Sequence, residues 1–222
     1  EFLQKLEAFL GKEIHRLSSE RDFEHWMMMN NTLLPSPQIR WCTKYMKIKP
    51  FEKFVGQDAV ISYVGIRADE NRQAYISQKP TIKTVFPFIE DGLEKADVFK
   101  ILEDTVGIPE YYKWRSRSGC YFCFFQKQSE WLELSERHPE LYEQAKQIEE
   151  KVRTKWDWKD GETEAGRIGY TWSSQGSLEE IVDRAKKKRQ ELGLISTDAP
   201  ISRWQDLLGD DDSDDACLIC TN

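Results

Sequence analysis

The chain's five cysteines are the residues most able to do chemistry, and four of them form two C-x-x-C pairs. Cys120 and Cys123 make the first pair, Cys217 and Cys220 the second, and Cys42 stands alone. A C-x-x-C spacing places two thiols on one side of a turn, where thiolates bind zinc or an iron–sulfur cluster. An odd number of cysteines does not suit a disulfide scaffold. The pattern therefore favours metal, iron–sulfur or redox chemistry.

The candidate metal ligands are Cys42, Cys120 and Cys123, which a fold would have to bring together across 78 residues of chain. Because such sites normally use four ligands, a fourth is needed, and the chain offers Cys217, Cys220 or His138. Two other interpretations stay open. The Cys120 pair is either a buried small hydrophobic element beside its phenylalanine neighbours or a redox dithiol.

Cations gather near the same cysteines, although the chain of 222 residues has a net charge of −7. They are Arg40, Lys44, Lys47 and Lys49 near Cys42, Lys113, Arg115 and Arg117 near Cys120, and Arg67 and Arg72 after a predicted strand. Guanidinium groups bind phosphate or sulfate through paired hydrogen bonds. The clustering predicts an anionic ligand, and the alternative is ordinary surface charge. The acidic balance does not favour a broad DNA-binding surface.

Alternating strands and helices must position these residues. The β-branched segment 59–66 predicts a buried strand, residues 84–89 a second one, and residues 93–105 a helix after the Asp91-Gly92 turn. Apolar spacings of three and four predict a helix over 1–29. The remaining helices are expected before Pro50 in 40–54, from the cysteines through 124–136, over 138–154, and from the Ser177–Glu180 capping box to about Leu192.

This order indicates an α/β fold, with an α/β domain over 1–155, a helical extension over 156–195 and an acidic flexible tail over 196–222 that carries the second C-x-x-C pair. Only two strands are visible, which suggests that further strands lie upstream. No apolar run is long enough to cross a membrane, and no secretory signal is recognisable, so a cytoplasmic location is expected.

Several motifs occur in an order that resembles the phosphoadenosine phosphosulfate (PAPS) reductase family, within the ATP-pyrophosphatase (adenine nucleotide α-hydrolase-like) superfamily. They are R-W-C-T-K-Y-M-K-I-K-P at 40–50, G-I-R-A-D-E-N-R at 65–72, D-V-F at 97–99, G-I-P at 107–109 and S-G-C-Y-F-C at 118–123. The resemblance covers about residues 38–155 and is nearest to the branch with the DNA phosphorothioation sulfurtransferases.

The resemblance implies a doubly wound (Rossmann-like) parallel sheet, here mainly its C-terminal half. ATP or an adenylyl nucleotide is expected at the carboxyl edge of the strands, bound through a region that this chain does not contain. The resemblance also implies that Arg40, Lys47, Arg67 and Arg72 surround sulfate or phosphate. By the same resemblance, the three cysteines at 42, 120 and 123 hold a [4Fe–4S] cluster, with zinc as the alternative metal.

The chain departs from the family pattern in three places. The S-G-G-x-D-S phosphate loop is absent, and no glycine-rich loop occurs before residue 56. Trp41 and Thr43 flank Cys42 where many cluster-bearing members have adjacent cysteines. The E-C-G-x-H motif of sulfonucleotide reductases is also missing, which argues against reduction of adenylyl sulfate.

These features predict an iron–sulfur sulfurtransferase or PAPS-reductase-like enzyme that acts on an adenylylated or phosphate-bearing substrate, with nucleic acid as the sulfur acceptor in a phage-defence system. The alternative is a non-catalytic subunit or binding module of a larger nucleic-acid-modifying or defence complex, in which the cysteines hold structural zinc. The absent phosphate loop favours this alternative.

Overall fold

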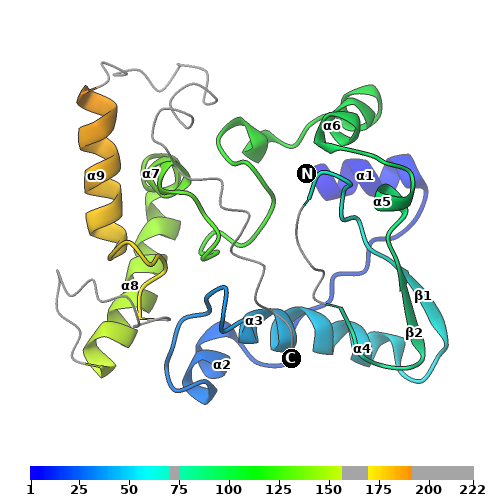
Figure 1. The fold of residues 1–222 in the computed structure, drawn as a ribbon, viewed down its shortest axis with the longest axis horizontal. Helices are drawn as coiled ribbons and strands as arrows, with labels where there is room; N and C mark the ends of the chain where they lie inside the picture. Colours follow the sequence, from blue (N-terminus) through cyan, green and yellow to red (C-terminus); the bar gives the residue numbers. More distant parts are fainter. Residues whose placement is uncertain (71–75, 157–169, 192–222) are drawn as a thin grey trace. The chain divides into compact units, whose positions relative to one another are not determined.

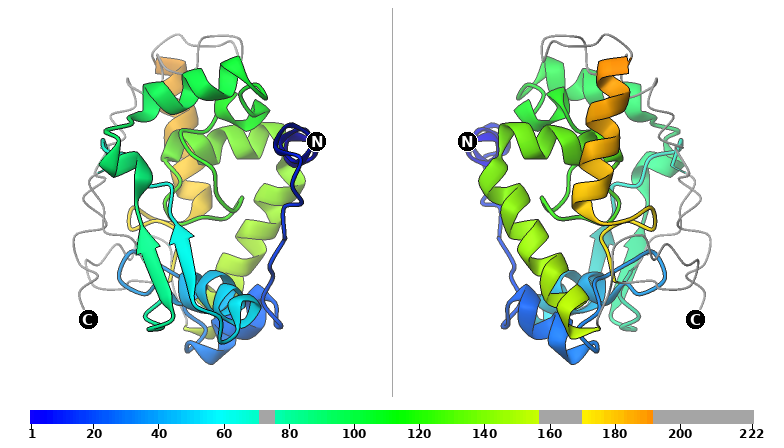
Figure 2. Two further views of the ribbon diagram at one scale, coloured as in Figure 1. Left: turned by 90° about the vertical axis from the view of Figure 1, so that its right-hand side faces the viewer. Right: turned by 90° about the vertical axis from the view of Figure 1, so that its left-hand side faces the viewer.

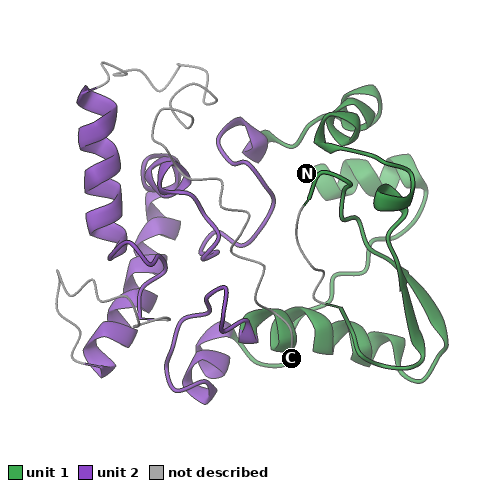
Figure 3. Cartoon of the chain, viewed as in Figure 1, with its two compact units in different colours: residues 1–22, 42–110, 214–222 green, residues 23–41, 111–213 purple. Residues whose placement is uncertain are grey.

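The protein is described here from a computed structural model, which covers residues 1–70, 76–156 and 170–191. The chain divides into two compact units (Figure 3). Among the described residues, unit 1 comprises residues 1–22 and 42–110, and unit 2 comprises residues 23–41 and those from 111 onward. Both units draw on the predicted domain 1–155. The predicted tail at 196–222 lies outside the described residues.

Unit 1 combines short helices with a small sheet (Figure 1). Its elements are α1 (Phe2–Leu10), the π-helix η1 (Lys44–Ile48), α4 (Lys49–Val55), β1 (Val60–Tyr63), β2 (Ile82–Val85), α5 (Pro87–Glu90) and α6 (Lys95–Asp104). The predicted helix over 1–29 is wrong. Helix α1 ends where Gly11 adopts a left-handed φ of 61°, which closes a helix without the strain of a side chain.

The sheet consists of two parallel strands, with Val60 opposite Ile82 and Tyr63 opposite Val85. The strands run side by side in both views of Figure 2. The mixed α/β class is therefore confirmed, and so is the existence of both strands, although the second begins two residues earlier than predicted. The prediction that the first strand is buried is wrong, because its residues Ile61 and Tyr63 are exposed. The second strand cannot extend to Ile89 because Pro87 starts α5, where a proline's fixed φ and missing N–H suit the first helical turn.

The segment around Cys42 is helical past the predicted stop at Pro50. Helix α3 (Trp41–Thr43), η1 and α4 follow one another without a break, and the boundary between the units falls inside α3. Lys49 donates its backbone N–H to the Lys44 carbonyl, one residue further back than in an α-helix. This π-turn accommodates Pro50 inside a helical segment because it shifts the backbone bonding before the residue that lacks an N–H.

Unit 2 is a helical bundle in which α7 packs against α8 and α9. Its helices are α2 (Phe23–Met29), α7 (Gln128–Arg137), α8 (Pro139–Lys155) and α9 (Leu178–Glu191), with a 3₁₀ turn η2 (Glu110–Lys113) at its edge. The predicted start of a helix at His138-Pro139 is confirmed. The capping box is confirmed too, since Ser177 and Glu180 exchange hydrogen bonds of 2.9 Å and 3.4 Å at the start of α9.

The hydrophobic core belongs almost wholly to unit 2. Among the described residues, every buried hydrophobic side chain except Ile66 and Ile82 lies in unit 2. In contrast, most exposed large hydrophobic side chains lie in unit 1: Leu3, Phe9, Leu10, Leu17, Phe54, Ile61, Tyr63, Ile89, Ile101 and Ile108. Unit 2 is thus the better packed body. None of the helices in the described ranges is long and apolar enough to cross a membrane.

Candidate functional site

The Cys120–Cys123 pair lies in a backbone turn of unit 2. The Cys123 N–H donates to the Cys120 carbonyl at 3.2 Å, and the Gln126 N–H donates to the Cys123 carbonyl at 3.0 Å. Both thiols are outside any disulfide; Cys120 is exposed and Cys123 is half-buried. The site therefore presents two reduced thiols from one turn, one of them open to solvent.

The prediction that a helix begins at these cysteines is wrong. Helix α7 begins at Gln128, because the Glu130 carboxylate accepts the Lys127 N–H at 3.0 Å and so fixes the helix start after the turn. The cysteines precede the helix by several residues. Their geometry is consequently set by the turn and its neighbours and not by helical spacing.

Phe122, between the two cysteines, anchors the turn in the core of unit 2. Its ring lies 4.6 Å from the Phe23 ring and 5.4 Å from the Trp172 ring, centroid to centroid. Trp172 is almost fully buried and donates its indole N–H to the Ala145 carbonyl at 2.9 Å. Phe122 thus contributes the apolar packing at this turn, which leaves the Cys120 thiol exposed. The interpretation of both cysteines as buried small hydrophobes does not fit Cys120.

Tyr121 ties the outer side of the turn to α8. Its hydroxyl donates to Gln144 Oε1 at 2.9 Å, and its carbonyl accepts the Gln126 side-chain N–H at 2.6 Å. Burial, and secondly the electrostatic interaction with the neighbouring Cys120, raise the pKa of Tyr121. The hydroxyl therefore remains a hydrogen-bond donor at neutral pH and holds the turn.

Arg115, predicted as a phosphate ligand, directs its guanidinium at the turn itself. It is only 7% exposed, and it donates from Nη1 to the Gly119 carbonyl and from Nη2 to the Cys120 carbonyl, each at 3.2 Å. Its Cζ lies 5.6 Å from the centre of the Trp114 ring. Both terminal nitrogens are thus engaged with backbone next to the first thiol.

Glu130 supports the same segment and was not singled out by the sequence. It is fully buried, and its Oε1 accepts hydrogen bonds from the Ser116 N–H at 2.6 Å and from the Ser116 hydroxyl at 2.8 Å. With its other oxygen on Lys127, it links the segment after Arg115 to the start of α7. An acidic residue three positions after the N-cap residue Lys127 was the available signal.

Arg40 and Arg117 converge on Phe125, just beyond the cysteines. The Cζ of Arg117 lies 4.6 Å from the centre of that ring and the Cζ of Arg40 lies 5.5 Å from it. Arg117 also donates to the Phe125 carbonyl at 2.8 Å. Two guanidinium groups thus share one ring, and guanidinium groups are donors that suit phosphate and sulfate.

The predicted metal ligand Cys42 and the predicted phosphate ligands Lys47 and Arg67 belong to unit 1. Cys42 is half-buried in α3, and Lys47 is exposed in η1. Arg67, in the loop after β1, forms ion pairs with Asp69 at 2.8 Å and with Glu70 at 2.9 Å. Its hydrogen bond lowers the pKa of Asp69. The charge of Arg67 is therefore balanced by two carboxylates of its own loop.

The candidates for a fourth metal ligand fall into two groups. His138, between α7 and α8, packs its ring 5.8 Å from the Trp114 ring and lies 3.6 Å from Glu140. The other candidates, Cys217 and Cys220, are outside the described residues, and so is the predicted phosphate ligand Arg72. Within the described ranges, no group of three or more His, Cys, Asp or Glu side chains is arranged to hold a metal ion.

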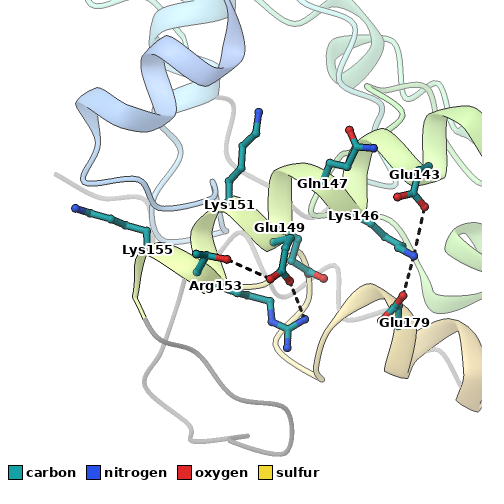
Figure 4. A pocket seen from close by; sticks show the side chains of 10 residues that line it. Glu143, Lys146, Gln147, Glu149, Lys151, Arg153, Lys155 and Glu179 are labelled. Atoms are coloured by element: carbon teal, nitrogen blue, oxygen red, sulfur yellow. Dashed lines mark hydrogen bonds and ion pairs between the residues drawn. The ribbon is translucent and has the colours of Figure 1, made fainter.

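A separate pocket of about 720 Å³ lies along α8 and the start of α9 (Figure 4). Its charges are paired: Lys146 lies between Glu143 at 3.3 Å and Glu179 at 2.7 Å. Glu149 is buried at its wall and accepts the backbone N–H groups of Trp172 and Leu178, both at 2.9 Å. Burial raises the pKa of Glu149 to about 7. This carboxylate joins α8 to the segment that leads into α9.

Comparison with known proteins identifies distant relatives and no family. No family model and no solved structure matches the chain. Two uncharacterized proteins of Methanocaldococcus jannaschii are similar to it. MJ0066 is 25% identical over 154 residues, which cover 64% of this chain and 31% of the relative. MJ0973 is 24% identical over 157 residues, which cover 61% and 37%. The chain thus spans about a third of the length of these relatives.

Proposed function

We propose that this protein is an iron–sulfur sulfurtransferase of the PAPS reductase type, which acts on an adenylylated or phosphate-bearing substrate in the cytoplasm. The observation that carries the proposal is the Cys120–Cys123 turn, with an exposed thiol, a backbone held by Arg115 and two further arginines beside it. Nucleic acid is the proposed sulfur acceptor, within a modification or phage-defence complex of several subunits.

The donor set of the turn suits a thiolate-bound metal. Thiolates hold [4Fe–4S] clusters and zinc, and two thiols in one turn supply half of a four-ligand set. Cys42 is the proposed third ligand, with Cys217, Cys220 or His138 as the fourth. A bound cluster would supply redox-active iron and sulfide at this turn. The chain's own contribution is to hold the thiols and to keep one of them accessible.

The proposed anion site uses Arg40 and Arg117. Their guanidinium groups share the Phe125 ring, so a phosphate or sulfate group would offset the repulsion between two like charges. Lys47, Arg67 and Arg72 remain proposed substrate contacts from unit 1 through the motif resemblance. Arg67 would first have to exchange its carboxylate partners Asp69 and Glu70 for the substrate.

The proposal includes a doubly wound sheet larger than the two strands described. The N–H groups of Val60 and Val64 point to β2, so by the alternation of a strand those of Ile61 and Tyr63 point to the opposite edge. The side chains of Ile61 and Tyr63 are 56% and 71% exposed. Parallel sheets are ordinarily covered on both faces, and two strands alone are marginal. The relatives' greater length is consistent with additional strands.

The decisive experiment is metal and acid-labile sulfide analysis of anaerobically purified protein, with its visible absorption spectrum. We expect about four iron and four sulfide per chain. Cys120→Ala, Cys123→Ala and Cys42→Ala should each lose the cluster, whereas among the fourth-ligand candidates only one of Cys217→Ala, Cys220→Ala and His138→Ala should do so. Full cluster content in all three of the first set would overturn the proposal.

The same measurement separates the second candidate function, a non-catalytic module with structural zinc. The packing of the turn suits this alternative, because Phe122 anchors the segment between the two cysteines in the core of unit 2. Zinc in place of iron, with a fold that collapses when a chelator removes it, would support the module. Iron with sulfide would exclude it.

A further inference from the structure

Arg115, the buried arginine beside the cysteines, lies in an environment that suits support of the turn and does not suit binding of a ligand at the surface. Arg115 is more than nine-tenths buried, and both of its terminal nitrogens donate to main-chain carbonyls of Gly119 and Cys120. Charged groups donate stronger hydrogen bonds than neutral ones, so this fork restrains two successive peptide units at the first thiol.

Gly119 adjoins both the same guanidinium and the second cysteine. A Cβ built on Gly119 would stand 3.7 Å from Arg115 Nη2 and 3.9 Å from the Cys123 Cβ, both ordinary van der Waals distances. Arg115 and Cys123 are therefore both neighbours of the residue that precedes the Cys120–Cys123 turn.

The hydrogen bonding of Arg115 is incomplete at one of its nitrogens. Its buried Nε–H donates to no described residue. A buried N–H without a partner costs folding free energy, which the two hydrogen bonds to carbonyls offset in part. Those same two bonds restrain the backbone of the turn.

We propose that Arg115 is a positioning residue that fixes the separation and orientation of the Cys120 and Cys123 thiols through its two hydrogen bonds to the turn. The inference rests on the proposed role of this thiol pair. It assigns Arg115 to the support of the cysteines and leaves the substrate's anionic group to Arg40 and Arg117.

The test uses phenylarsine oxide, a metal-free probe of paired thiols. Its arsenic forms two As–S bonds as two thiols give up their protons, and the arsenic-bound oxygen leaves as water, so no oxidant or reductant is needed. The protein carries Cys217→Ala and Cys220→Ala to remove the second pair. In this background we expect Arg115→Met and Arg115→Lys to weaken arsenical binding about tenfold, the loss expected from one or two charged hydrogen bonds.

The control is Arg189→Gln, which removes an ion pair between α9 and Glu136 of α7 without touching the turn. It should leave arsenical binding unchanged. The single ammonium group of Arg115→Lys cannot span two carbonyls. Undiminished arsenical binding by this variant would therefore overturn the proposal, even if Arg115→Met does not fold. An equal loss of arsenical binding in Arg115→Lys and in Arg189→Gln would overturn it as well.

The outcome is independent of the iron analysis. Weakened arsenical binding in a protein that never holds iron would keep the positioning role and reject the sulfurtransferase. Where iron is present, Arg115→Lys should also alter the cluster's visible spectrum and reduction potential, which a purely structural effect at a distance would leave in place.

Discussion

Two buried carboxylates of unit 2 have structural roles that their residue type alone does not predict. Glu149 and Glu130 are carboxylates at almost fully buried positions, and each is satisfied by backbone N–H groups from a segment distant in sequence. Each carboxylate links its helix to another segment through hydrogen bonds. For Glu149, burial raises the pKa because it penalises the charged form, while the two N–H donors lower it.

Glu149 should make stability depend on pH. Its folded-state pKa of about 7 exceeds the ordinary 4.5, so the unfolded state releases this proton first as the pH rises. The stabilisation is therefore complete below about pH 4.5 and is lost as the pH passes 7. Relative to Glu149→Gln, the wild-type protein should lose up to about 3 kcal/mol between pH 4.5 and 8. Urea unfolding followed by tryptophan fluorescence checks this, and parallel pH profiles would contradict it.

At the scale of elements, the sequence predicted helix starts correctly where interactions within a few residues determine them. The Ser177–Glu180 box and Pro139 mark helix starts through bonds or ring geometry within a few residues, and both helices begin where the sequence indicates. Pro87 ended a strand that periodicity alone extended too far. Gly11 likewise ended a helix that apolar spacing alone continued.

The candidate site was less predictable because it depends on contacts between distant segments. The clustering of arginines near Cys120 could be read from the sequence. The inward direction of Arg115 could not, since it follows from a turn whose Phe122 packs on Phe23 and Trp172, residues far away in the chain. Burial of Glu130 against Ser116 is tertiary in the same sense.

Gly176 offers a test of how α9 begins. Its φ of 130° is suited to glycine, and a Cβ there would lie 2.5 Å from Glu180 Oε2. Gly176→Ala should therefore cost about 1–3 kcal/mol, partly through backbone strain and partly by displacing the Glu180 carboxylate from the Ser177 N–H. A double-mutant cycle with Glu180→Ala separates the two contributions, because removal of the carboxylate abolishes only the second. Strict additivity in thermal unfolding would show that the clash is not felt.

On the scale of the whole molecule, the two units differ in how much apolar surface they bury. Unit 2 encloses Trp131, Trp172 and the buried faces of α2, α7, α8 and α9, whereas unit 1 buries Ile66 and Ile82 and leaves both Ile61 and Tyr63 exposed. Since burial of apolar surface is the main favourable term in folding, unit 1 should be the weaker body.

The units should therefore open separately. The six tryptophans in the described ranges all lie in unit 2, so the change in their fluorescence reports on that unit. We expect the amides of β1 and β2 to lose protection from hydrogen exchange at lower urea concentrations than those at which the fluorescence changes. Coincident transitions would show instead that the chain unfolds as one cooperative body.

The aromatic cluster of unit 2 can form completely only late in the synthesis of the chain. Phe23 stacks with Trp41 and Phe122, and the cluster closes only with Trp172, which follows Phe23 by 149 residues. At about 5–20 residues per second, a ribosome takes roughly 7–30 s to cover that distance. During that interval Phe23 and Trp41 leave the exit tunnel without their final partner. The nascent chain is thus a ready client for chaperones that bind aromatic segments, and a product that stops before Trp172 cannot complete its core.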